Sequence, residues 1–278
     1  MLTDNNFARV RKCLMLEGKP DRVPTAELHV DLEVKEAFLG RPIASAQDDV
    51  DFWVAAGYDY IALSAGLLNV GGVLSGEATM RKRHSYTAYG DGQREVTWAA
   101  EGEGVITTRE QFENFAWPAP DDIDLEHIKE HAALLPEEMR IILIIGKVFT
   151  STWMLMGMEG FGLASRFDPE LLNDVFARVA EIQYRTFERA LDLPGIGALW
   201  MSDDMAYGTG LLCDPSIFRE HVFPVYRRMG DLCEQLDLPF ALHSDGDLTP
   251  LMQDIVDCKF RALHPHRAAG HGCEESPG

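Results

Sequence analysis

Hydrophobic residues recur along the chain with two periods, one typical of helices and one typical of strands. Over residues 168–192 the apolar positions lie three or four apart behind an Asp168–Pro169 start, which predicts a long amphipathic helix. Short apolar or alternating runs predict six strands, at 22–30, 58–66, 140–146, 196–204, 239–247 and 260–265. Further helices are predicted between them, at 5–16, 45–57, 109–115, 123–135, 214–236 and 249–258. Thr108 and Gln111 form a capping-box pattern at the start of the one at 109–115.

The order of these elements indicates the fold class. Strands that alternate with helices predict parallel neighbours joined by right-handed crossovers. No glycine-rich phosphate-binding motif follows any predicted strand, which disfavours an open nucleotide-binding sheet. We therefore predict a single α/β domain over residues 1–278, a (β/α)8 barrel of the TIM type. Residues 80–106 alternate around turn signals and predict an inserted antiparallel hairpin.

The predicted barrel is short of strands. A closed TIM barrel has eight, and only about six are predicted before residues 266–278, which are small, polar and without pattern. We expect a barrel truncated after about six strands and an irregular stretch over 266–278. Open strand edges and uncovered apolar faces then predict a homodimer or poor solubility.

Charge and composition exclude several classes of partner. The 45 acidic and 25 basic residues give a formal charge of −20, which repels nucleic acid and anionic lipid. The longest apolar run, at 141–145, is too short to cross a bilayer, and residues 1–20 lack the apolar core of a secretory signal. Five cysteines without a C-x-x-C spacing fit reduced thiols. We expect a cytoplasmic protein that acts on a small molecule.

Acids and histidines cluster where the predicted strands end, which is where barrel enzymes place their active sites. They are Glu27, His29, Asp203, Asp204, His243, Asp245, Asp247 and His264. Carboxylates gathered at one rim repel one another unless a cation lies among them. Histidine nitrogen with carboxylate oxygen is a common ligand set for zinc and related divalent metals. We predict His243 and Asp245 as the metal ligands.

Several of these residues have a structural alternative. Asp245 and Asp247 are also suited to making the turn and capping the next helix. His29 is alternatively a hydrogen-bonded core histidine. Adjacent residues at a strand end point to opposite sides, so only one of Asp203 and Asp204 faces the pocket. We expect Asp203 to face it and Asp204 to hold the loop that follows.

Five motifs resemble the uroporphyrinogen decarboxylase superfamily. They are "KPDRVP" at 19–24, "GKVFTSTWMLMG" at 146–157, the block at 202–229, "LHSDGD" at 242–247 and "ALHP" at 262–265. The similarity extends over most of residues 5–265. It implies a (β/α) barrel with its site at the strand ends.

The resemblance divides into two branches. The decarboxylases bind a porphyrinogen through an arginine-rich segment after the first strand, where this chain reads "AELHVDLE". The methyltransferases move a methyl group between a corrinoid and a thiol, with zinc held by a His-x-Cys pair. His243 and Asp245 match that pair, with Asp245 in the place of the cysteine. The resemblance is therefore nearer to the methyltransferase branch.

This branch implies a metal-dependent methyltransferase-like enzyme that uses zinc or another divalent metal. The methyl group would pass from a corrinoid, carried by a partner protein, or from another small donor to a nucleophile. The predicted residues are Asp203, Asp204 and Glu27 for catalysis, His243 and Asp245 for the metal, and His29, Thr150, Trp153, Met154, Tyr207 and His264 for the substrate. The alternatives are porphyrinogen decarboxylation in porphyrin biosynthesis and a non-catalytic barrel that binds a small molecule or corrinoid.

Overall fold

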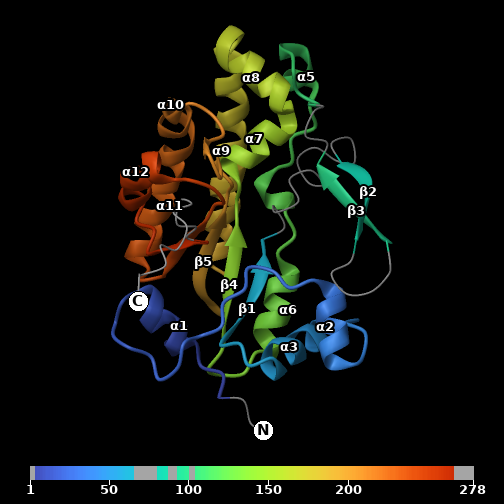
Figure 1. Cartoon of the computed structure of the whole chain (residues 1–278), viewed down its shortest axis with the longest axis vertical. Coiled ribbons are helices and arrows are strands. Elements are labelled where there is room, and N and C mark those ends of the chain that lie inside the picture. Colours follow the sequence, from blue (N-terminus) through green and yellow to red (C-terminus); the bar gives the residue numbers. More distant parts are fainter. Residues whose placement is uncertain (1–3, 66–79, 87–92, 100–103, 266–278) are drawn as a thin grey trace, which may run out of the picture.

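A five-stranded parallel sheet forms the centre of the computed structural model, which describes residues 4–65, 80–86, 93–99 and 104–265 (Figure 1). The strands, in their order across the sheet, are β1 (Tyr60–Ser64), β4 (Arg140–Ile145), β5 (Ile196–Ser202), β8 (Phe240–His243) and β9 (Ala262–His264). All four neighbouring pairs are parallel. The predicted α/β class with a parallel sheet is confirmed.

The sheet is wound in one direction only. Its spatial order follows the order of the strands along the chain, so every crossover adds the next strand on the same side. A doubly wound sheet reverses direction at a switch point, whereas the wall of a TIM barrel does not. The five strands share the winding of such a wall, but the described residues do not close it into a barrel.

One face of the sheet carries most of the helices, and we call it the helical face. The helices are α3 (Ala46–Ala55), α6 (Glu126–Leu134), α7 (Val148–Met156), α9 (Pro169–Leu191), α11 (Phe223–Gln235) and α12 (Met252–Asp257). Leu143, Leu199 and Leu242 point to this face and are fully buried in the larger hydrophobic core. In α9, the predicted amphipathic helix, the Asp168 carboxylate caps the start by accepting from the amide of Leu171.

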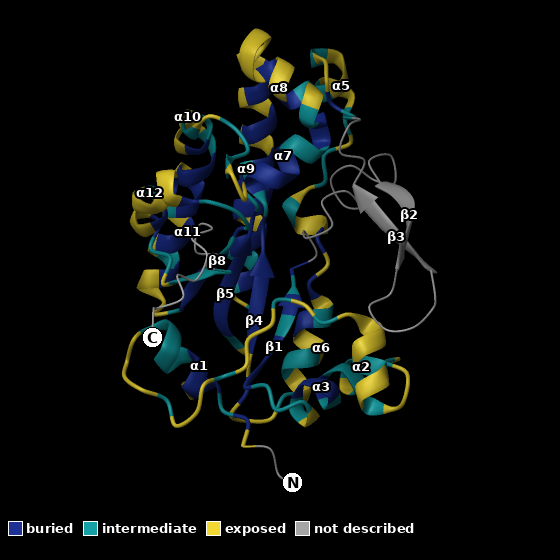
Figure 2. Cartoon of the chain, viewed as in Figure 1, coloured by how far each residue is buried: buried dark blue, intermediate teal, exposed yellow. Residues whose placement is uncertain are grey.

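The opposite face, which we call the inner face, is covered more thinly. It carries a smaller core in which Phe7 and Val10 of α1 (Phe7–Leu14) pack against Tyr60, Ile142 and Trp200. Between α1 and α2 (Leu32–Leu39) the chain crosses in front of the strands as a largely exposed segment, drawn yellow in Figure 2.

That crossing segment corrects one predicted strand. Residues 22–30 form no regular secondary structure and Val23 is 86% exposed. The backbone of Glu27 bonds instead to the Tyr60 hydroxyl, which receives its N–H at 2.6 Å and donates to its carbonyl at 2.8 Å. The side chain of Tyr60 therefore occupies groups that a sheet ladder would need, and Pro24 has no N–H to donate. Within the described residues the central sheet therefore has five strands, not six.

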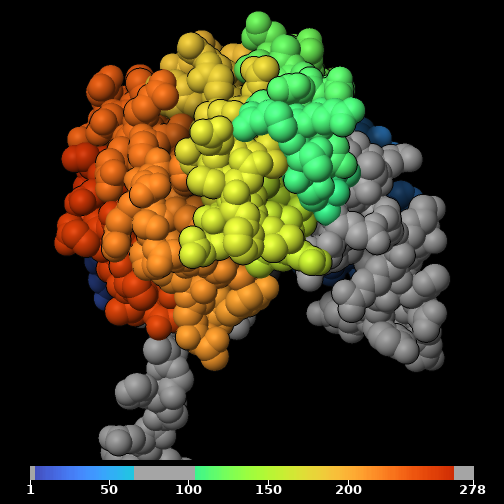
Figure 3. Space-filling view, turned by 90° about the horizontal axis from the view of Figure 1, so that it is seen from above, coloured from blue at the N-terminus to red at the C-terminus, as the bar shows by residue number. Residues whose placement is uncertain are grey.

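Shorter elements cover the end of the sheet at which the strands finish. They are α5 (Arg109–Asn114), α8 (Met158–Phe167), β6 (Ala206–Tyr207), β7 (Gly210–Leu211), α10 (Pro215–Ile217), the π-helical turn η3 (Phe218–Val222) and η4 (Thr249–Leu251). The short helix η2 (Pro120–Asp122) lies instead at the end of α9, where the Pro120 carbonyl accepts from Arg189. Seen from above in Figure 3, the yellow atoms of the α7–α8 region lie between the green ones near residue 110 and the orange ones beyond residue 205. The predicted capping box of α5, made by Thr108 and Gln111, is confirmed.

The predicted hairpin is also confirmed. β2 (Met80–Tyr86) and β3 (Gln93–Ala99) pair antiparallel, from Met80 opposite Ala99 to Tyr86 opposite Gln93.

Within the part of the chain that the structure describes, none of the helices combines the length and apolar character that crossing a bilayer requires. The residues predicted to be irregular, 266–278, lie outside the described ranges.

Candidate active site

Three acidic and imidazole side chains meet where β5 and β8 end. Asp204 follows β5, His243 is the last residue of β8, and Asp245 follows it. Each offers a ligand atom, and the three atoms lie within 4.8 Å of one another. All three residues are partly buried. The strand ends therefore bring two carboxylates and one imidazole to a single point.

The position of His243 follows from the pleat of β8. Successive side chains of a strand point to opposite faces, so Leu242 enters the helical face while Ala241 and His243 point to the inner face. The parallel register then sets His243 between Ser202 of β5 and His264 of β9. His243 lies at the sheet's carboxyl end, on the less covered face.

Two loops pack against each other beside the site. Gly246 has a φ of +90°, and a Cβ atom there would lie 2.4 Å from the carbonyl carbon of Ala206. The amide of Asp247 donates to the Tyr207 carbonyl at 2.9 Å, and the amide of Met205 donates to the Ser244 hydroxyl at 2.9 Å. Only glycine allows this approach without strain, so the loop at 204–211 rests directly on the loop that carries Asp245.

Asp203 and Asp204 lie in opposite surroundings. Asp203 was predicted to face the pocket and Asp204 to hold the following loop, but Asp204 is the one that lies at the site. The Asp203 side chain is fully buried on the helical face, where its carboxylate accepts from the amides of Phe149 and Thr150, both at 2.8 Å, and from the Tyr226 hydroxyl at 2.5 Å. It caps the start of α7 from a neighbouring strand. Asp204 is 46% exposed and joins His243 instead.

Burial dominates the electrostatics of both key groups. Burial raises the pKa of the Asp203 carboxyl, against the pull of its hydrogen bonds from Thr150 and Tyr226. Burial likewise lowers the pKa of His243, although the negative charge of Asp204 opposes that change. A neutral imidazole has the lone pair that metal binding needs, so the lowered pKa of His243 favours a ligand role.

Hydrogen bonds and one ion-pair contact connect the candidate ligands. The Nε2 atom of His243 lies 3.5 Å from Oδ1 of Asp204, and the same Oδ1 accepts from the backbone amide of Asp245 at 3.0 Å. On its other side, Nδ1 of His243 lies 2.9 Å from Nδ1 of His264. His264 is thus attached to His243 in addition to lining the pocket beside it.

Asp247 has the structural role that was the alternative to metal binding, at the start of the next helix. Its carboxylate accepts from the backbone amide of Thr249 at 3.0 Å, at the start of η4. Bonding to Thr249 lowers the pKa of Asp247, as expected for a carboxylate at a helix start. Asp247 is absent from the three-residue ligand cluster.

The other predicted site residues are dispersed. Glu27 and His29 are exposed on the crossing segment, where the His29 side chain, 77% exposed, lies 3.5 Å from Asp31. The described ligand cluster includes neither Glu27 nor His29. Among the predicted substrate-binding residues, Thr150 is buried in α7 and Tyr207 is 63% exposed on β6.

Trp153 and Met154 are half-buried on α7. The neighbouring Thr150 donates its backbone amide to Asp203, so α7 is attached to the end of β5. The position of Trp153 and Met154 is therefore set by the same buried aspartate that adjoins the site.

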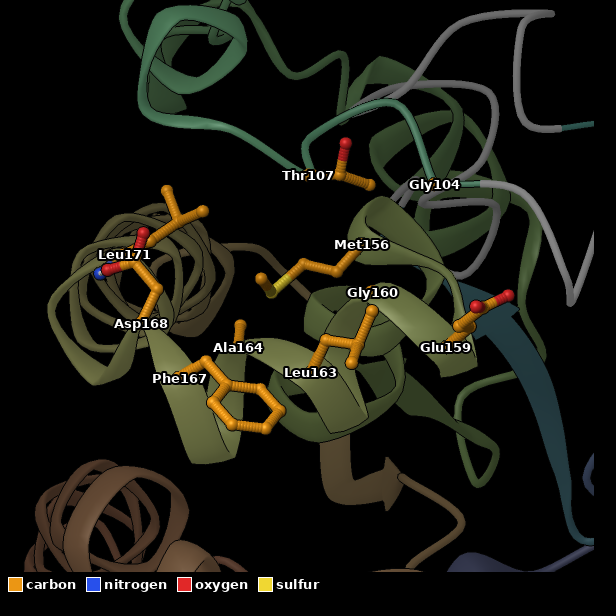
Figure 4. A pocket seen from close by; sticks show the side chains of 10 residues that line it. All are labelled: Gly104, Thr107, Met156, Glu159, Gly160, Leu163, Ala164, Phe167, Asp168 and Leu171. Carbon is orange, nitrogen blue, oxygen red and sulfur yellow. Dashed lines mark hydrogen bonds between the residues drawn. The ribbon is translucent and has the colours of Figure 1, made fainter.

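Two cavities flank this region. An apolar groove of about 280 Å³ runs along the inner face and ends at His264, with Cys13, Tyr60 and Trp200 among its walls. A second cavity, of about 270 Å³, lies between α8, the start of α9 and residues 104–107 (Figure 4). Its walls include Met156, Phe167 and the capping Asp168, but none of the predicted site residues. The groove is the cavity that adjoins the candidate ligands.

Two features escaped the sequence analysis. Tyr226 lies on α11, far along the chain from Asp203, and nothing in the local pattern connects them. The pairing of His243 with His264 did leave a signal, because both strands end in the tripeptide Ala-Leu-His. Neighbouring parallel strands set those tripeptides in register and their histidines side by side.

Comparison with known proteins gives a match among solved structures. The sequence matches no family model, and no curated protein sequence is similar to it at a significant level. Among solved structures the chain is similar to a methyltransferase from Methanosarcina mazei, with a TM-score of 0.59 and 16% sequence identity over 92% of this chain and 74% of that one. At this identity the likeness shows a shared fold.

Proposed function

We propose that this chain is a metal-dependent enzyme of the methyltransferase type, built on a TIM-barrel-like wall of the uroporphyrinogen decarboxylase superfamily. The observation that carries the proposal is the cluster of Asp204, His243 and Asp245, whose ligand atoms lie within 4.8 Å of one another. The fold likeness to a methyltransferase supports the same class of reaction.

The donor set fits a divalent cation. One imidazole nitrogen and two carboxylate oxygens are ligands that zinc, iron and manganese accept, and two of the groups lie two residues apart at the end of β8. Without a sulfur ligand such a site is a harder Lewis acid than a thiolate site. We therefore assign zinc or a related divalent metal to Asp204, His243 and Asp245.

When bound, the cation would make a small nucleophile more reactive by stabilising its deprotonated form. The protein's own groups provide the rest. Asp204 and Asp245 supply the negative charge that draws a cation to the rim, while burial lowers the pKa of His243 and so favours the imidazole form that binds through nitrogen. The walls of the apolar groove beside His264 exclude water from the body of a small substrate.

The methyl transfer itself needs a donor. We infer a methylcorrinoid on a partner protein, or another small methyl donor, which would keep the electron pair of its bond to the methyl group when the nucleophile takes that group. The nucleophile loses its proton in becoming the anion that attacks. Asp204, His243 and Asp245 would hold the cation at the rim, and the groove that ends at His264 would take the small substrate beside it.

Metal analysis tests this proposal directly. Purified protein is expected to bind about one zinc ion per chain, and His243→Ala is expected to lose most of that affinity, by at least about 100-fold, because a ligand is removed. His29→Ala changes an exposed histidine outside the cluster and is the matched control, expected to bind like the unmodified chain. Equal zinc binding by both variants, or none by the unmodified chain, contradicts the proposal.

A further inference from the structure

A second histidine lies directly behind the candidate ligand. In the register of β8 and β9, His243 is opposite His264, and their Nδ1 atoms are 2.9 Å apart. That separation is a hydrogen-bond distance, so one proton lies between the two nitrogens. One ring donates and the other accepts, and the two neutral rings cannot both donate.

The other ring nitrogen of His243 decides which ring should donate. Nε2 faces the candidate metal position, 3.5 Å from Oδ1 of Asp204. A cation binds an imidazole nitrogen through its lone pair, so a metal-bound Nε2 carries no proton and the neutral ring carries its proton on Nδ1. The only described partner of that Nδ1 is Nδ1 of His264, which must then be the acceptor.

Resting on the metal site of the proposed function, we propose that His264 is a positioning residue that accepts the Nδ1 proton of His243. It thereby holds His243 with the Nε2 lone pair directed between Asp204 and Asp245. Metal-binding histidines usually donate their second nitrogen to a fixed acceptor, and here a histidine provides that acceptor.

The two rings together carry the same number of protons before and after a cation binds. In the alternative arrangement His264 donates from Nδ1, and His243 carries its proton on Nε2, facing Asp204. Cation binding releases the Nε2 proton of His243, and the shared proton moves onto Nδ1 of His243. His264, now without a proton on Nδ1, takes one on Nε2. One proton leaves Nε2 of His243 and one is taken up at Nε2 of His264, so the number of protons on the two rings stays the same.

His264 is held firmly enough for this role. Its carbonyl accepts from the amide of Ser244 at 3.0 Å, which fixes its backbone to the loop of the site. Its ring packs edge to face against Trp200, with centroids 5.1 Å apart and planes at 86°. A ring held by both backbone and neighbour keeps its Nδ1 on His243.

Two substitutions separate positioning from packing. Asn places an amide where the imidazole has Nδ1, so His264→Asn keeps an acceptor, whereas His264→Leu fills similar space without one. We expect His264→Leu to bind zinc about 10- to 100-fold more weakly, and His264→Asn to recover most of that loss. His29→Leu, on the exposed crossing segment, is the control and should bind like the unmodified chain.

NMR of protein labelled with ¹⁵N-histidine supplies a readout that packing alone would not change. In the zinc-loaded chain, His243 should show a proton on Nδ1 in a strong hydrogen bond and a metal-bound Nε2. His264→Leu should lose that hydrogen-bonded signal, and His264→Asn should keep one.

The outcomes distinguish this inference from the proposed function. Zinc binding that is lost in His243→Ala but unchanged in His264→Leu overturns the role of His264 and leaves the metal site standing. Zinc bound to His243 through Nδ1 overturns it as well. If the unmodified chain binds no zinc, the proposed function fails and this inference fails with it.

Discussion

The two faces of the central sheet come from the same five strands but have different chemistry. The helical face is apolar and closed, with Leu143, Leu199 and Leu242 fully buried under helices. The inner face carries His243 and His264, and among the described residues α1 and the crossing segment cover it. Side chains on the closed face determine stability, whereas those on the open face are accessible to a ligand.

Asp203 and Asp204 show that a single step along the chain leads from the helical face to the candidate site. The amide of Asp203 still continues the ladder by donating to the His243 carbonyl at 3.0 Å, and its side chain enters the helical face. One residue later, the Asp204 side chain joins His243. Because strand side chains alternate, a shift of one position changes a buried helix cap into a candidate metal ligand.

The largest effect that we expect is a difference in stability between variants of these two aspartates. Asp203→Asn places an amide among three donors, so at least one donor loses its acceptor in a fully buried site. We expect a loss of about 3 kcal/mol in the free energy of unfolding. Asp204→Asn changes a half-exposed side chain and should alter that free energy by less than about 0.5 kcal/mol while weakening zinc binding. Urea unfolding and zinc titration of both variants measure the contrast.

Tyr226→Phe serves as the control for the buried side of this pair. It removes only the hydroxyl that donates to Asp203, and the backbone donors of Phe149 and Thr150 remain. We expect a loss of about 1 to 2 kcal/mol, smaller than that of Asp203→Asn. A destabilised Asp204→Asn beside an unaffected Asp203→Asn would reverse the assignment of the two faces.

A smaller effect is expected at the loop that covers the open face. Gly246→Ala puts a methyl group 2.4 Å from the Ala206 carbonyl carbon at a φ of +90°, so the loop that carries Asp245 must move. We expect a loss of about 2 kcal/mol in the free energy of unfolding, together with weaker zinc binding. Gly208→Ala lies in the facing loop with nothing within 4 Å of the added methyl and should change neither. Equal behaviour of the two variants would show that the contact does not shape the site.

The sequence predicted the helical face better than the inner face. The start of α9 at Asp168–Pro169, the capping box of Thr108 and Gln111, and four of the five sheet strands near their observed bounds all rest on local patterns. The strand predicted at 22–30 was wrong because its alternation satisfied a local rule while its backbone groups bonded to a side chain. Local patterns report helix caps and periodicity but not distant partners.

The candidate site shows the same division. His243 and Asp245 were predicted as a pair because an imidazole and a carboxylate at the end of one strand are common metal ligands, and the structure brings them together with Asp204. The roles of Asp203 and Asp204 depend on which face each side chain enters. That choice is set by the ladder to β8 and by Tyr226 on a distant helix. A sequence read locally carries no information about either contact.

The smallest expected effect concerns a charge cluster between helices of the helical face. His131 of α6 lies 3.4 Å from Asp49 of α3, and Asp49 also pairs with Lys35 of α2 at 2.5 Å. Burial lowers the pKa of His131, but hydrogen bonds to Asp49 and to the His127 carbonyl outweigh burial, so the pKa is raised overall. Burial likewise opposes ionisation of Asp49, yet its bonds to His131 and Lys35 lower its pKa.

These shifts predict a pH window for the cluster. Because the pKa of His131 is raised on folding, its stabilisation is complete below the unfolded value of 6.5 and is lost as the pH rises through the folded pKa. The lowered pKa of Asp49 makes its own contribution disappear as the pH falls through the folded value, below about 4. His131→Asn retains a donor for the His127 carbonyl but cannot become charged. Its deficit in unfolding free energy should therefore be largest near pH 5 to 6, at no more than about 1 kcal/mol, and should shrink towards pH 8. Urea unfolding of both proteins across this range measures the difference, and a deficit that grows with pH would mean that His131 is neutral in the folded chain. In that case the Lys35–Asp49 ion pair would be the charged contact of this cluster, and His131 would contribute through its hydrogen bond to the His127 carbonyl and through packing.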